Sequence, residues 1–235
     1  MYSGRCLIRN REAFKMKKNS KIALIFGIAL IIGFALWTAL ISFVDVKAIG
    51  PNGSSVGFSC LNGFFQEAIG VDLTLYNLTD YLSLIPLASA AAFAFMGLFQ
   101  WIKRRKISRV DFDILVLGGF YIVVFAAYLL FEIISVNFRP VLIDGILESS
   151  YPSSTTMLIL CIMPTAAMQI SNRLKIKALR IGSISLISAF TAFMLIGRIF
   201  SGVHWITDII GGILISGGLV SLYYSFSSLR DHDNN

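Results

Sequence analysis

The sequence predicts an all-α, polytopic membrane protein with about six transmembrane helices and both termini in the cytoplasm. Of its 235 residues, 56% are hydrophobic and only 14% are charged, whereas soluble domains usually carry about 25% charged residues. The apolar residues occur in runs about as long as a bilayer requires. Basic residues gather in short clusters between these runs, as they do in cytoplasmic loops.

The chain begins with a polar, basic stretch, residues 1–20, which we expect to lie in the cytoplasm. Met16 is an alternative start. A single transmembrane domain is expected over residues 21–228, and its first apolar run covers residues 22–44. Because the apolar core of a cleaved signal peptide is only about 7–15 residues long, we expect this longer run to be an uncleaved first helix.

A polar loop is expected next, over residues 45–80. Within it, five apolar residues recur at helical spacing: Phe58, Leu61, Phe64, Phe65 and Ile69. They predict a short helix, for which two interpretations stay open. The favoured one is a helix that caps the bundle, and the other is an amphipathic helix lying on the membrane surface.

Five further spans are expected, at about 81–102, 113–135, 155–171, 181–199 and 205–226. A second polar loop covers residues 136–153, and a polar tail covers residues 229–235. Tyr76 and Trp205 are expected in the aromatic belts that form where helices meet the membrane surface.

The net charge of +7 follows from the basic clusters before the first span and around residues 103–109 and 173–180. It therefore reports topology, and nucleic acid is not expected as a partner. No cofactor and no metal are expected either, because the carboxylates are scattered and a single His–Asp pair offers too few ligands.

Ionisable and hydroxyl residues at the outward ends of the spans form the candidate functional site. They are Arg139, Arg198, His204 and Asp208, joined by Ser153 and Ser154 at the expected start of the fourth span. Four residues separate His204 from Asp208, so on a helix the two side chains share one face. The backbone N–H groups at the start of the fourth span suit an anion.

These residue types together suit a phosphate group. Arginine matches phosphate oxygens with two parallel hydrogen bonds, and backbone amides stabilise charge that develops during a reaction. A histidine can attack phosphorus, and a carboxylate on its other nitrogen fixes the tautomer and stabilises the cation.

The order Arg139-Pro140, Pro152-Ser153-Ser154 and Arg198-x5-His204-x3-Asp208 resembles the type 2 phosphatidic acid phosphatase (PAP2) family, from about the third span to the sixth. The resemblance implies a PAP2-like bundle and a multi-pass cell-membrane phosphatase that acts, without a metal, on a lipid phosphate or diphosphate at the outer face. It also implies particular roles. His204 would be the nucleophile that forms a phosphohistidine and Asp208 its partner, while Arg139, Arg198, Ser153 and Ser154 would bind phosphate.

Three positions depart from the pattern of this family. Glu132 replaces a lysine, Thr155 replaces the general-acid histidine, and Gly197 replaces a serine. Thr155 cannot act as an acid near neutral pH, and Glu132 repels phosphate unless it is paired or protonated.

Two other hypotheses therefore stay open. One is a catalytically weakened relative that binds or moves phospholipid head groups. The other is a small transporter, which ranks last because the sequence shows neither charges near the bilayer midplane nor inverted repeats.

Overall fold

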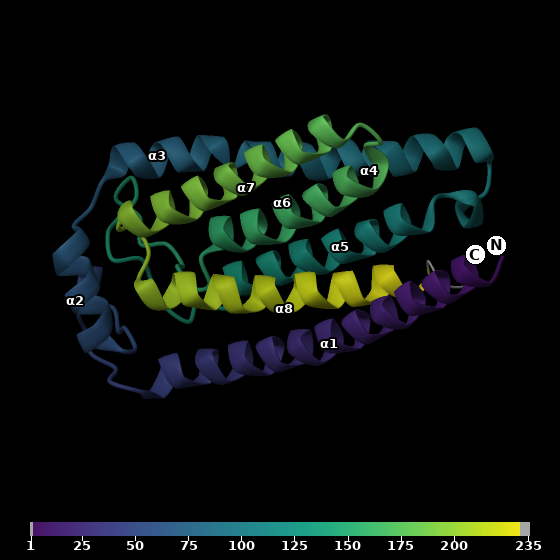
Figure 1. Cartoon of the computed structure of the whole chain (residues 1–235). Coiled ribbons are helices and arrows are strands. Elements are labelled where there is room, and N and C mark those ends of the chain that lie inside the picture. The colour runs from purple at the N-terminus through teal and green to yellow at the C-terminus, as the bar shows by residue number, and fades with distance from the viewer. Residues whose placement is uncertain (1, 231–235) are drawn as a thin grey trace.

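The structure, a computed structural model, describes residues 2–230 of the chain and the side chains of residues 18–228. Within this part it is a bundle of α-helices without strands. The long helices run roughly along one axis, and α2 lies across one end of the bundle (Figure 1). The helices are α1 (Tyr2–Phe43), α2 (Ser59–Ile69), α3 (Leu73–Leu82), α4 (Leu84–Arg104), α5 (Phe112–Ile133), α6 (Ser154–Arg173), α7 (Lys177–Phe200) and α8 (Ile206–Arg230).

Six helical segments in the described part are long and apolar enough to cross a membrane, which confirms the predicted number. They are Lys18–Phe43, Leu73–Arg104, Phe112–Ile133, Ser154–Arg173, Lys177–Phe200 and Ile206–Ser228. The fold class predicted from the sequence is therefore correct. Of the predicted polar tail, residues 231–235 lie outside the described part of the chain.

The second span begins earlier than the sequence suggested. It was expected at residue 81, but helix α3 already begins at Leu73 and leads into α4. Asp72 fixes this start because its carboxylate accepts a hydrogen bond from the backbone N–H of Leu75 (2.9 Å), a common way to begin a helix. The polar residues of α3 look like a loop in the sequence, and they are polar because some of them face the site described below.

The helix predicted around residues 58–69 is present as α2, and it caps the bundle. The Nδ2 group of Asn62 donates to the Oγ1 atom of Thr207 at the start of α8 (3.0 Å). The Nε2 group of Gln66 donates to the carbonyl of Gly202 (3.0 Å). Both bonds attach α2 to the segment that joins α7 to α8, which supports the capping interpretation.

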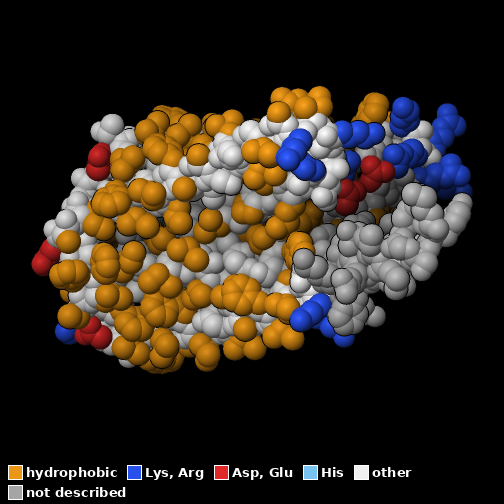
Figure 2. Space-filling view, viewed as in Figure 1, with side chains coloured by type: hydrophobic (Ala, Val, Ile, Leu, Met, Phe, Trp, Pro, Cys, Tyr) orange, Lys and Arg blue, Asp and Glu red, His pale blue; other side chains and the backbone are white. Residues whose placement is uncertain are grey.

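The start of α1 and the end of α8 lie at the same end of the bundle (Figure 1). Lysine and arginine side chains also gather at this end, whereas acidic side chains mark the opposite end of the visible face (Figure 2). This distribution matches the excess of basic residues that cytoplasmic loops carry.

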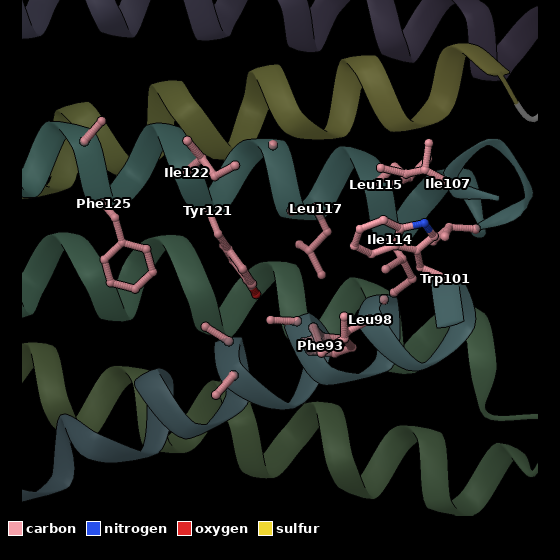
Figure 3. A pocket seen from close by; sticks show the side chains of 18 of the residues that line it. Phe93, Leu98, Trp101, Ile107, Ile114, Leu115, Leu117, Tyr121, Ile122 and Phe125 are labelled. Atoms are coloured by element: carbon pink, nitrogen blue, oxygen red, sulfur yellow. The ribbon is translucent and has the colours of Figure 1, made fainter. Parts of the chain in front are cut away.

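An apolar groove of about 900 Å³ runs between α4 and α5. Figure 3 shows apolar side chains of both helices lining it, among them Trp101, Leu117 and Phe125. None of the residues proposed for the site lines this groove.

Helices α1 and α8 pack closely because two glycines meet. A Cβ atom at Gly27 would lie 3.1 Å from the carbonyl oxygen of Gly218 and from the side chain of Leu222. A Cβ atom at Gly33, on the same helix, would meet nothing within 4 Å. Small residues allow such close approach between helices in a membrane.

We expect Gly27→Leu to destabilise the protein, because the added side chain forces α1 away from α8. The cost should be about 1–3 kcal/mol, as for other overpacked sites. The measurement is the midpoint of thermal unfolding in detergent, with Gly33→Leu as the matched control on the same helix. Equal midpoints for the two variants would contradict this packing.

Candidate functional site

The candidate site lies at the end of the bundle opposite to the start of α1 and the end of α8. Two parts of the chain that are far apart in the sequence meet there: the loop of residues 134–153, and the turn that joins the C-terminal end of α7 to the N-terminal end of α8 (Figure 1). Helix α3 forms a further side, because it packs against α7. The structure thus brings together Arg139, Arg198, His204 and Asp208.

The turn before α8 holds His204 in place. Gly202 has a φ of +63°, and a Cβ atom there would lie 1.8 Å from the carbonyl oxygen of Gly70. Only glycine tolerates both this conformation and this close approach. The backbone N–H of Asp72 donates to the carbonyl of Ser201 (3.0 Å), so the start of α3 and the turn stabilise each other.

His204 lies in this turn rather than on the helix, because α8 begins at Ile206. It does not share a helical face with Asp208, as the spacing had suggested. Instead, Ser150 lies between the two side chains. Its Oγ–H donates a short hydrogen bond to Oδ2 of Asp208, and its Oγ lies 3.2 Å from Nδ1 of His204.

The tautomer of His204 follows from these contacts. The Nδ1 atom also lies 3.2 Å from the carbonyl oxygen of Ser150, and a carbonyl can only accept a hydrogen bond. Nδ1 therefore carries the proton, and Nε2 carries a free lone pair. The Nε2 atom is buried and has no hydrogen-bond partner, which leaves it available to a ligand.

Asp208 is fully buried and held by three donors. Besides Ser150, Nδ2 of Asn137 donates to its Oδ1 (3.2 Å), and the backbone N–H of Trp205 donates to its Oδ2 (3.1 Å). A buried carboxylate needs such partners to remain charged. Its orientation is therefore fixed before any ligand arrives.

Two glycines of α8 allow the segment before α6 to approach. A Cβ atom at Gly211 would lie 2.5 Å from the ring of Tyr151, and one at Gly212 would lie 3.2 Å from the carbonyl oxygen of Ser153. The backbone N–H of Ser153 donates to the carbonyl of Asp208 (3.0 Å). Helix α6 therefore begins, at Ser154, directly beside the His204 turn.

Both arginines are almost completely buried, with 8% of Arg139 and 1% of Arg198 exposed. Arg198 donates from Nη2 to Oγ1 of Thr155 (2.8 Å) and from Nη1 to Oγ1 of Thr79 (3.2 Å). Its Nε has no hydrogen-bond partner, and Nη1 of Arg139 has none either. Buried donors without acceptors are costly, so these guanidinium groups suit an anionic ligand.

Acidic residues contact both guanidinium groups from their more exposed side. Glu148 forms an ion pair with Arg139 (3.0 Å), and Asp80 lies 3.9 Å from Nη2 of Arg198. Glu132 forms no ion pair with either arginine, although pairing was one of the possibilities raised by its position. It is exposed on α5 and lines a pocket of about 10 Å³ that His204 also lines.

The environment of His204 favours its neutral form. Burial lowers the pKa of His204 well below the usual 6.5, and the positive charges of Arg139 and Arg198 lower this pKa further. A neutral imidazole is the form in which a ring nitrogen can act as a nucleophile.

Four residues of the site were not recognised in the sequence: Ser150, Asn137, Thr79 and Tyr76. Ser150 and Asn137 carry no motif, and only their hydrogen bonds in the folded loop reveal them. Tyr76 was expected in an aromatic belt, but its ring lies over both arginines. Trp205 was expected there too, but it is buried and donates to the carbonyl of Phe138 (2.7 Å).

The fold and the position of this cluster first define a class of protein. It is a multi-pass membrane protein that holds a histidine and two arginines at one end of its helical bundle.

Comparison with known proteins then shows what the chain is similar to. The model of the PAP2 superfamily matches residues 134–231, a range that contains Arg139, Arg198, His204 and Asp208. The fold is similar to a crystal structure described as a transmembrane PAP2-type phosphatidylglycerolphosphate phosphatase from Bacillus subtilis. The TM-score is 0.53 and the identity 18%, over 89% of this chain and 97% of that chain. No curated protein sequence matches significantly. The chain is therefore similar to the PAP2 superfamily over residues 134–231, and its fold is similar to that of the solved structure.

We expect His204 to remain neutral, with its proton on Nδ1, at pH 5.5, where an ordinary histidine is mostly protonated. The chain has 2 histidines, so the variant His232→Gln leaves His204 as the only one. Nitrogen-15 NMR of labelled imidazole in detergent micelles distinguishes the two tautomers and the cation. A ring that titrates near pH 6.5, or that carries its proton on Nε2, would contradict the assigned contacts.

Proposed function

We propose that the protein is a membrane phosphatase that hydrolyses a lipid phosphate or diphosphate. The observation that carries this proposal is the buried, unpartnered Nε2 atom of His204 in one cluster with two arginines, each of which keeps a buried N–H group without a hydrogen-bond partner. Its lone pair can attack phosphorus, and the arginines can neutralise the oxygens of the phosphate group. The similarity of residues 134–231 to the PAP2 superfamily supports this chemistry.

In the proposed reaction, Nε2 of His204 attacks the phosphorus atom and forms a phosphohistidine, while the bond from phosphorus to the lipid oxygen (or, in a diphosphate, to the bridging oxygen) breaks and the leaving oxygen takes a proton from water. A water molecule then attacks the phosphohistidine, the P–N bond breaks, and inorganic phosphate and the neutral imidazole are released. Positive charge develops on the ring as the bond forms. Asp208 stabilises this charge through Ser150, which touches both side chains. Arg139, Arg198 and the start of α6 at Ser153 and Ser154 bind the phosphate oxygens, because arginines and helix N-termini both favour anions.

The orientation in the membrane follows from charge. Basic side chains gather at the end of the bundle where α1 begins and α8 ends (Figure 2), and from the positive-inside trend we infer that this end faces the cytoplasm. The site then opens at the outer face of the cell membrane. A substrate whose tail lies in the bilayer can present its phosphate group there.

We expect His204→Ala to abolish phosphate release from phosphatidate and from farnesyl diphosphate in detergent, because the nucleophile is lost. The assay measures inorganic phosphate and the trapped phosphoprotein, with His232→Gln as the matched control that keeps the wild-type rate. Equal rates in wild type and His204→Ala would refute the proposed mechanism.

A second candidate function is a weakened relative that binds or moves phospholipid head groups without hydrolysis. Two positions favour it: Thr155, which offers no proton near neutral pH, and the carboxylate of Glu132, which repels phosphate. Binding of labelled lipid phosphates that depends on Arg139 and Arg198, without turnover, would support this alternative.

The substitution Thr155→His tests whether the missing acid limits the reaction. The side chain at this position contacts Arg198, so an imidazole there can protonate a leaving alkoxide. Because general acids contribute about 10²–10⁴-fold, we expect faster hydrolysis of phosphatidate, by on the order of tenfold or more. Hydrolysis of farnesyl diphosphate, whose leaving group needs less help, should change little.

The matched control for this experiment is Thr155→Asn, which keeps hydrogen bonding but provides no acid. An equal gain in Thr155→Asn, or equal gains on both substrates, would contradict the role assigned to position 155.

A further inference from the structure

Helix α3 brings an aromatic ring to the two arginines. The ring centre of Tyr76 lies 5.0 Å from Cζ of Arg198 and 5.5 Å from Cζ of Arg139. The two arginines come from different parts of the fold, since Arg198 ends α7 and Arg139 belongs to the loop after α5. A single side chain therefore touches both cations.

The position of this ring depends on Gly197. A Cβ atom at Gly197 would lie 2.7 Å from the side chain of Thr79 and 3.7 Å from that of Leu75. The missing side chain allows α3 to lie directly against the end of α7. Thr79 is then fully buried and accepts a hydrogen bond from Arg198 (3.2 Å), one turn of helix after Tyr76.

The ring of Tyr76 can offset the repulsion between the two arginines. Two guanidinium groups that bind one anion must lie near each other, and their like charges repel in the buried site. The face of an aromatic ring attracts cations, and this attraction grows where water is excluded. Glu148 and Asp80 also contact the arginines but are more exposed, at 41% and 55% of their side chains, so they can move away into solvent.

We propose that Tyr76 is a positioning residue that holds Arg139 and Arg198 in the arrangement that binds the phosphate group. This inference rests on the proposed function only in that the anion is a phosphate. The ring face provides the attraction, and the hydroxyl group is not required. Nη1 of Arg139 and Nε of Arg198, which have no hydrogen-bond partner, then remain free for the phosphate oxygens.

The test measures binding of orthovanadate, a phosphate analogue, to the purified full-length protein in detergent by titration calorimetry. Tyr76→Met keeps an apolar side chain of similar size but removes the ring. We expect its dissociation constant to rise on the order of tenfold. Tyr76→Phe keeps the ring and should retain most of the affinity. Tyr81→Leu is the matched control on the same helix, because Tyr81 is 75% exposed, and it should bind as the wild type does.

Kinetics provide a second measurement that loosened packing alone would not reproduce. With farnesyl diphosphate, Tyr76→Met should raise KM more than it lowers kcat, while the unfolding midpoint stays close to that of Tyr81→Leu. Wild-type affinity in Tyr76→Met, or an equal loss in Tyr76→Phe and Tyr76→Met, overturns the inference.

The outcomes also separate this inference from the proposed function. If the wild type binds vanadate, Tyr76→Met binds it weakly and no lipid phosphate is hydrolysed, the positioning role stands and the phosphatase function fails. If the wild type hydrolyses lipids and Tyr76→Met binds vanadate equally well, only the positioning role fails. A wild type that does not bind vanadate overturns both.

Discussion

Burial of two arginines beside a neutral histidine is the constraint on which this end of the molecule depends. Charged groups are costly to bury unless the surrounding structure pairs them. Here α3, α6 and the loop after α5 each contribute one polar group that contacts an arginine. Thr79 of α3 and Thr155 of α6 accept hydrogen bonds from Arg198, and Glu148 of the loop pairs with Arg139. The close packing of α3, α6 and α7 is therefore also the means by which the charges are tolerated.

Glycine positions explain how these elements come so close. Gly197 admits α3, Gly202 forms the turn that carries His204, and Gly211 and Gly212 admit the segment before α6. At each of these places a Cβ atom would lie 3.2 Å or less from a neighbouring atom. The segments of the site can thus pack this closely because glycine has no side chain at the contact points. The polar side chains of the neighbouring residues provide the chemistry of the site.

The sequence predicted those features that depend on residues close together in the chain. Long apolar runs and basic clusters predict the six spans, because a bilayer demands a certain helix length and a certain loop charge. The spacing of Arg198, His204 and Asp208 and their place at span ends indicated the site in the same way. The start of α3 was missed because its polar residues face a site that exists only after folding, which also hid the position of Tyr76.

Ser150 could not have been predicted for a related reason. No pattern distinguishes it from Ser149 beside it, and its role depends on a loop that returns to α8 after folding. Asn137 reaches Asp208 in the same way. Contacts of this kind join residues about 50 to 70 positions apart, where local periodicity carries no information.

The loop that holds Ser150 also holds Asn137 and Arg139. The same short segment therefore carries a ligand for the anion, a clamp on the buried carboxylate and the group that orients the imidazole ring. If this segment moves outward, all three functions are lost together. An open form of the protein would have a histidine that is neither oriented nor supported by its carboxylate. The orientation of the proposed nucleophile and the arrangement of the proposed anion site therefore depend on one and the same segment of the chain.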